Sequence, residues 1–210
     1  METDKLVLRK LSETDIDDLV ESGNDYDVHY NSFFLMKFPF GKKEAIEVIN
    51  EDRKSKNMER FGIELKETGT IIGLIDLYNI KESNPALHSS QNQESFPQMH
   101  KKAKIRDDLC EASPAGGKLK LGYWIGRNYR QKGYATEAIK KIIKYAFEKY
   151  NVDEIIATTL ISNESSMNLL KKLGFAKGKV LKNDRFLDGK YIDSVQFVLK
   201  REDYLRNKQA

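Results

Sequence analysis

The 210-residue sequence predicts a mixed α/β (α+β) fold in a single domain, and three observations support this. Short segments rich in β-branched and aromatic residues, which are typical of strands, occur near both ends of the chain. One long segment in the second half repeats its apolar residues every three or four positions, as a helix packed on a core does. Turn residues separate these segments. We therefore expect helices to flank one central sheet.

The first half of the chain predicts two helices among three strands. Ser12 and Asp15 have the spacing of a capping pair at a helix start, with Asp15 in place of the more usual glutamate. The apolar loop at 33–40 is expected to be core or the wall of a substrate pocket, with an interface as the open alternative. The expected elements are, in order, a strand at 6–10, a helix that buries Ile16, Leu19 and Val20, the loop, a helix at 42–56 that buries Ala45, Ile46, Val48 and Ile49, and a β-hairpin at 61–65 and 70–78.

Residues 81–117 break this pattern. They show poor periodicity, hold three of the four prolines and include a polar run at 89–93. Irregular segments of this length are uncommon in a compact domain unless they are functional or disordered. We expect an irregular insertion between the third and fourth strands, within one domain that spans 1–210.

The second half predicts a strand, a long helix, a strand, a short helix and a closing hairpin. The long helix turns one apolar side to the core and leaves lysines on its other side. Asp188-Gly189 is a strong turn pair for the hairpin. The expected elements are a strand at 121–125, a helix that buries Ala135, Ala138, Ile139, Ile142, Ile143, Ala146 and Phe147, a strand at 153–159, a helix at 164–173, and strands at 180–186 and 191–200.

Composition excludes several classes of protein. No apolar run approaches the roughly 20 residues that cross a bilayer, and the first residues lack a signal-peptide pattern, so we expect a cytoplasmic protein without a membrane partner. Cys110 is the single cysteine, so there is no internal disulfide, and with only three scattered histidines no metal site is expected. The net charge of +4 is modest and does not indicate a nucleic-acid partner.

The turn at 130–135, Arg-Gln-Lys-Gly-Tyr-Ala, lies between the fourth strand and the long helix. Gly133 and Ala135 are small enough to let backbone N–H groups approach a ligand, and a helix N-terminus offers unpaired donors. Arg130 and Lys132 add two positive charges at the same point. The combination predicts a pyrophosphate site, although glycine-containing turns before helices are also common without one.

Two motifs give the chain a family resemblance. Arg130-x-x-Gly133-x-Ala135 resembles the acyl-CoA motif of the GNAT superfamily of N-acetyltransferases. The segment from Asn163 to Phe175 (Asn-x-x-Ser, then Gly-Phe) is similar to that of the branch containing the ribosomal-protein N-terminal acetyltransferases. The resemblance implies a twisted mixed sheet whose fourth and fifth strands splay apart, with acetyl-CoA as cosubstrate in the gap between them.

The resemblance also implies which residues hold acetyl-CoA. Fourth-strand backbone would bond the pantetheine arm, the turn would hold the pyrophosphate, and Lys171 or Lys172 would approach the 3′-phosphate. Two alternatives stay open, because Asn163 is also suited to capping the short helix and the lysines to plain solvation. The implied cofactor-binding residues are Tyr123, Trp124, Ile125, Arg130, Gln131, Lys132, Gly133, Tyr134, Ala135, Thr136, Asn163, Ser166 and Lys172.

The implied reaction is direct attack of an uncharged amine on the acetyl thioester in a ternary complex. A backbone N–H at Trp124 or Ile125 is the expected oxyanion donor. Many relatives place a carboxylate base where this chain has Lys120, and a tyrosine acid where it has Leu170. The remaining candidates are Ser166 as the acid, and Glu64, Asp76 or a chain of waters as the base.

Two functions of different kind follow. The leading one is an amine N-acetyltransferase acting on a protein N-terminus or a small-molecule amine. The alternative is a non-catalytic CoA-binding sensor or interaction module, because Lys120 and Leu170 replace the usual proton-handling groups. The sequence leaves two questions open, the identity of the amine acceptor and whether the protein is a monomer or a homodimer.

Overall fold

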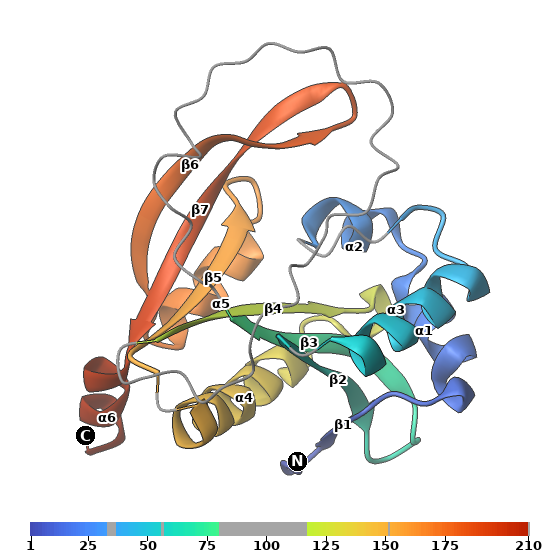
Figure 1. The fold of residues 1–210 in the computed structure, drawn as a ribbon, viewed down its shortest axis with the longest axis horizontal. Coiled ribbons are helices and arrows are strands. Elements are labelled where there is room, and N and C mark those ends of the chain that lie inside the picture. Colours follow the sequence, from blue (N-terminus) through green and yellow to red (C-terminus); the bar gives the residue numbers. More distant parts are fainter. Residues whose placement is uncertain (33–36, 56, 80–116, 151, 210) are drawn as a thin grey trace.

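The computed structural model describes residues 1–32, 37–55, 57–79, 117–150 and 152–209 (Figure 1). The insertion predicted at 81–117 therefore lies outside the described residues except for Gly117. Part of the apolar loop, 33–36, lies outside them as well. Among the described residues, no helix is both long enough and apolar enough to span a membrane.

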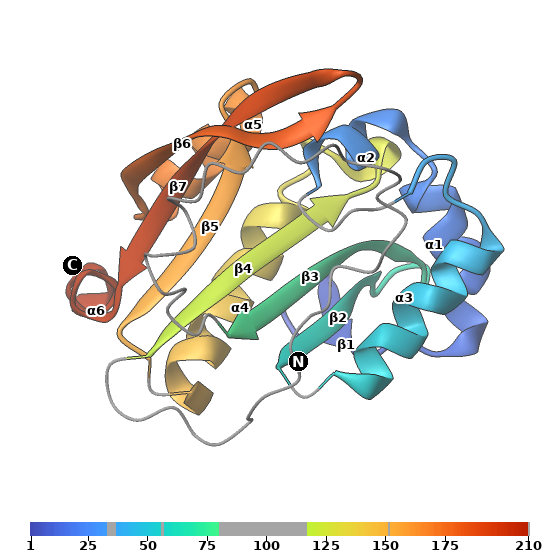
Figure 2. The ribbon, with the colours of Figure 1, turned by 45° about the horizontal axis from the view of Figure 1, so that its top comes forward.

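A seven-stranded mixed sheet forms the centre of the fold, with the order β1-β2-β3-β4-β5-β7-β6 (Figure 2). Neighbouring strands are antiparallel except for β4 and β5, which are parallel. The predicted mixed sheet is thus confirmed. The strands are β1 (Leu6–Arg9), β2 (Met58–Leu65), β3 (Ile71–Asn79), β4 (Lys118–Ile125), β5 (Glu154–Leu160), β6 (Ala176–Leu187) and β7 (Lys190–Lys200).

Helices cover both faces of this sheet (Figures 1 and 2). On one face α4 and α5 pack on the larger apolar core, and α4 buries every predicted residue except Ala135, which is half-buried. On the other face α1 and α3 enclose a second core with Leu74 and Trp124. The helices are α1 (Ile16–Gly23), α2 (Tyr26–Asn31), α3 (Lys42–Lys54), α4 (Tyr134–Tyr150), α5 (Glu164–Lys172) and α6 (Arg201–Gln209), with short 3-10 turns η1 (Glu13–Asp15) and η3 (Arg127–Tyr129).

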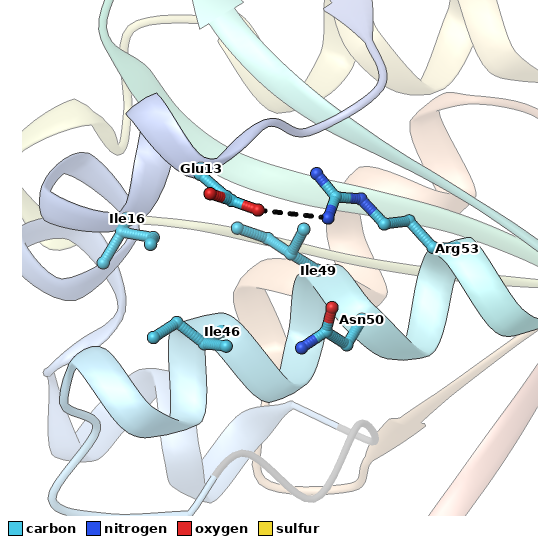
Figure 3. Close-up of a pocket in the computed structure, with 6 residues that line it drawn as sticks. All are labelled: Glu13, Ile16, Ile46, Ile49, Asn50 and Arg53. Carbon is cyan, nitrogen blue, oxygen red and sulfur yellow. Dashed lines mark hydrogen bonds and ion pairs between the residues drawn. The ribbon is translucent and has the colours of Figure 1, made fainter.

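The buried side of α3 differs from the prediction at Ile46. Ala45 and Ile49 are buried as expected, but Ile46 is 44% exposed. Its side chain helps to line a pocket between η1, α1 and α3, where Arg53 pairs with Glu13 at 3.3 Å (Figure 3). Four apolar positions in five residues exceed the width of one buried stripe, so one of them faces solvent.

Two helices, α2 and α6, were not predicted. The side chain of Asp25 caps α2 by accepting from the backbone N–H of Asp27 at 2.9 Å. At the start of α6, Arg201 donates to the carbonyls of Val152 (2.8 Å) and Phe147 (2.9 Å). Both helices are short, and contacts with distant parts of the chain hold them in place, which a local periodicity does not reveal.

The sheet opens between β4 and β5. Their parallel pairing runs from Lys118 with Glu154 to Leu121 with Ala157. No pair joins β4 to β5 beyond Leu121 among the described residues, whereas β3 follows β4 as far as Ile125 and β7 follows β5 as far as Leu160. The predicted splay is confirmed, and it leaves one edge of each strand open.

Candidate active site

The open edge of β4 presents the backbone of Tyr123 and Ile125. The N–H of Gly126 donates to the carbonyl of Ile72 at 2.9 Å, so Gly126 faces the β3 side. Because alternate residues of a strand direct their backbone groups to the same side, Trp124 also faces β3, while Tyr123 and Ile125 face the gap. Of the two predicted oxyanion donors, this geometry therefore favours Ile125. Trp124 instead packs its ring, 6% exposed, in the α1–α3 core.

The turn from β4 to α4 has the backbone shape of an anion site. Gln131 (φ 62°) and Gly133 (φ 86°) both adopt left-handed conformations, and alternation of this kind directs successive N–H groups to one side. The helix begins at Tyr134, and its first N–H groups lack partners within the helix. A Cβ on Gly133 would meet no atom within 4 Å, so the space before the turn is open. The turn has the backbone shape that an anion site requires, and pyrophosphate binding there stays a prediction.

The two cationic side chains that are predicted to bind phosphate, Arg130 and Lys132, lie in different surroundings. Arg130 donates from Nε to the carbonyl of Ile125 at 3.0 Å, and its guanidinium lies 3.5 Å from Asp25 and 3.6 Å from Asp27. Lys132 is exposed, with Nζ 5.7 Å above the ring of Tyr129. The charge of Arg130 is therefore largely compensated within the protein, and Lys132 is the side chain better placed to meet a phosphate.

Asn163 and Ser166 lie at the start of α5, directly after β5. The carbonyl oxygen Oδ1 of Asn163 accepts from the N–H of Ser166 at 3.1 Å, so the capping role left open by the sequence is present. The hydroxyl of Ser166 lies 2.9 Å from that of Tyr123, whose pKa burial raises to about 12. This pair links α5 to β4 beside the gap. Sequence patterns gave no signal for it, because the two residues are far apart in the chain.

Comparison with known proteins identifies the family. The acetyltransferase (GNAT) domain model matches residues 5–176. The chain belongs to the GNAT acetyltransferase family. An uncharacterized N-acetyltransferase, p20 of Bacillus licheniformis, is 28% identical over 96% of both chains. Membership confirms the expected enzyme class, an acyltransferase that acetylates amines.

Two further relatives resemble this GNAT chain in part or in fold. The ribosomal protein uS5 alanine N-acetyltransferase of Escherichia coli is 33% identical over 40% of this chain and 43% of its own. The structure of a spermidine N-acetyltransferase from Vibrio cholerae, in complex with CoA and spermine, superposes with a TM-score of 0.69. That match covers 97% of this chain and 99% of the other at 19% identity, which shows a shared fold.

The two candidate bases of this GNAT domain are engaged in ion pairs. The carboxylate of Glu64 accepts from Arg9, which also holds Asp15 at 2.7 Å. Asp76, 1% exposed, accepts from Nε and Nη2 of Arg60 at 3.1 Å. Each carboxylate is thus occupied by an arginine, and Asp76 is also enclosed in the core, away from an incoming amine, although burial raises its pKa above the ordinary value. We therefore do not assign either residue to proton removal.

The structure gives no new role to the remaining positions that the sequence analysis discussed. Leu170, at the family's tyrosine position, is 1% exposed in the core. Lys120 stands opposite Ile156 on the paired half of β4. Lys171 and Lys172 are exposed at the end of α5, so their predicted approach to a 3′-phosphate stays a prediction. The pocket of Figure 3 contains none of the predicted site residues.

The ion-pair cluster beside the turn predicts a pH dependence. Arg127 donates to Asp25 at 2.9 and 3.0 Å and to Asp27 at 2.9 Å, and the bond from Arg127 holds the pKa of Asp25 below its ordinary value. A lowered folded-state pKa stabilises the fold above the unfolded pKa of about 4, and this stability is lost as pH falls through the folded value. We expect Asp25→Asn, which keeps a good helix cap, to lower the melting temperature slightly at neutral pH.

Thermal unfolding of the wild type and of Asp25→Asn, measured across a pH series, checks this prediction. The difference in melting temperature should narrow as pH falls below about 4 and as salt rises. A difference that stays constant with pH would show that the asparagine perturbs packing and not charge.

Proposed function

We propose that this protein transfers the acetyl group of acetyl-CoA to a primary amine by direct attack in a ternary complex, in the cytoplasm. The observation that carries the proposal is the open edge of β4 beyond Leu121, which ends at the turn before α4, where Gln131 and Gly133 have left-handed backbone conformations. An extended ligand with amide groups would pair with the backbone of Tyr123 and the N–H of Ile125, whose carbonyl already accepts from Arg130, while its diphosphate meets the turn. CoA has both parts.

Each task of the transfer has a group in this arrangement. The backbone of Tyr123 and Ile125 would hold and polarise the thioester, and the N–H of Ile125 is the proposed oxyanion donor. Ser166 is the proposed donor to the leaving sulfur, either directly or through water. Solvent is the proposed acceptor of the amine proton, because Glu64 and Asp76 are bonded to arginines.

The acceptor is proposed to enter beside α2 and the tip of the β6–β7 hairpin (Figure 1). The tip is tied to this helix, since the hydroxyl of Tyr26 donates to Asp188 and Arg185 donates to the carbonyl of Ser32 at 2.9 Å. The relatives suggest two acceptor classes, the alanine N-terminus of a ribosomal protein and the polyamine spermidine. Both present a primary amine.

Release of CoA thiol from acetyl-CoA tests the proposal. Purified protein should be screened with N-terminal peptides, spermidine, aminoglycosides and amino acids, with an amine-free control. We expect amine-dependent release with one of these classes, and mass spectrometry of the product would locate the acetyl group. Confirmed CoA binding without release for any amine would favour the non-catalytic CoA sensor instead.

A further inference from the structure

The hydroxyl of Tyr123 reaches from one side of the sheet opening to the other. Tyr123 lies two positions beyond Leu121, the last β4 residue paired with β5. Its hydroxyl is 2.9 Å from Oγ of Ser166, in the first turn of the helix that follows β5. A single side-chain hydrogen bond therefore spans the place where the two strands diverge.

Both members of this pair are held in place. The ring of Tyr123 packs against the apolar core beneath α4, and β3 pairs with β4 on both sides of it, with Ile75 opposite Tyr123 in the register. Ser166 is fixed by its N–H bond to Asn163 at 3.1 Å. Because neither partner hangs from a loose segment, the geometry of the pair is preorganised.

The 2.9 Å separation allows either hydroxyl to donate. Because a phenol is more acidic than an aliphatic alcohol, donation from Tyr123 to the oxygen of Ser166 is the favoured direction. Burial raises the pKa of Tyr123 to about 12, so the phenol keeps its proton at neutral pH. With its oxygen occupied by Tyr123, the proton of Ser166 is free to point to a third group.

We propose that Tyr123 is a positioning residue that aims the hydroxyl proton of Ser166 at the thioester sulfur, an inference that rests on the proposed function. As the carbon–sulfur bond breaks, its electron pair passes to sulfur, and Ser166 donates a hydrogen bond to the developing thiolate. Water supplies the proton that completes the thiol and accepts the proton lost by the amine. Tyr123 itself transfers nothing.

The ionisation of CoA bound as product tests this directly and needs no amine. Carbon-13 NMR of CoA labelled at the carbon next to sulfur would follow the thiol pKa in the wild type, Tyr123→Phe, Ser166→Ala and the double variant. A donor to the thiolate lowers the thiol pKa, so each single variant should raise it by about one unit. The double variant should shift no further than Ser166→Ala, because Tyr123 acts only through Ser166.

Turnover provides the second readout. Tyr123→Phe should lower kcat about tenfold with little change in the KM for acetyl-CoA, because the ring and its packing remain. Tyr204→Phe is the matched control, since Tyr204 packs against the same core from α6, away from the turn and from the sheet opening. It should leave the thiol pKa, kcat and melting temperature unchanged.

The possible outcomes separate this inference from the proposed function. An unchanged thiol pKa in Tyr123→Phe, or shifts that add in the double variant, would overturn the positioning role even if the wild type is active. If the variants shift the CoA thiol pKa as expected but the wild type acetylates no amine, the role of the pair is supported and catalysis is rejected. A wild type that does not bind CoA would reject both.

Discussion

Gly133→Asp should abolish CoA binding, with a dissociation constant raised roughly 100-fold or more. The backbone at Gly133 has φ 86°, and a Cβ there meets no atom within 4 Å. The new side chain therefore projects from the turn into open space without a clash inside the protein. Its carboxylate would stand where the pyrophosphate is proposed to lie, beside amide donors that can serve only one anion. Isothermal titration with CoA measures the loss.

Gly69→Asp is the matched control for this change. Gly69, in the turn between β2 and β3, has φ 70°, and a Cβ at this position would also meet no atom within 4 Å. Both variants should suffer the same strain of a non-glycine residue in the left-handed region, about 1–2 kcal/mol. Equal losses in melting temperature with unequal losses in CoA affinity would isolate the ligand effect. Retained affinity in Gly133→Asp would remove the turn from the binding site.

Asp76→Asn should destabilise the fold by about 3–5 kcal/mol, because it leaves the guanidinium of Arg60 buried beside a neutral amide. Asp76 and Arg60 are 1% and 4% exposed, and the pair joins β3 to β2. A domain has about 5–15 kcal/mol in total, so this is a large share. The free energy of unfolding in urea measures it.

A double variant separates charge from packing at this site. Replacing both partners, as Arg60→Met with Asp76→Leu, removes the buried guanidinium, which also lies 3.9 Å from Glu51, and should recover part of the stability lost in Asp76→Asn. The carbonyl of Val48, 3.0 Å from Nη1 of Arg60, loses its donor, so recovery should be incomplete. If Asp76→Asn instead kept full stability but lost turnover, Asp76 would regain its place as the candidate base.

Local sequence patterns were sufficient to predict the main strands and helices of the fold and their order along the chain. The apolar repeat of α4 and the strand chemistry of β4 are properties of neighbouring residues, and the turn between them is contiguous in sequence. Helix α2 escaped prediction because its six residues depend on Asp25, whose partner Arg127 lies about a hundred positions away. Helix α6 is mostly polar and is held by bonds from Arg201.

The same distinction applies to the site. Backbone features of the turn followed from its glycine and its position before a helix. The pairing of Arg130 with Asp25, of Asp76 with Arg60 and of Tyr123 with Ser166 arises from the folded sheet. Because of these contacts, Arg130 and Asp76 act in ion pairs within the protein, and the hydroxyl of Tyr123 meets Ser166. A motif therefore locates this site, but tertiary contacts decide which of its side chains remain available.

The divergence of β4 from β5 has a consequence for colloidal behaviour. A strand with unpaired N–H and C=O groups at the rim of a sheet invites pairing with other chains and so promotes aggregation. Here the unpaired edges lie inside the sheet order, between β4 and β5, and not at its rim. To pair with them, a strand of another molecule would have to enter between β4 and β5, with its side chains on both faces of the sheet. The fold thus keeps unpaired backbone N–H and C=O groups on β4 and β5 that other protein molecules cannot approach from the rim of the sheet.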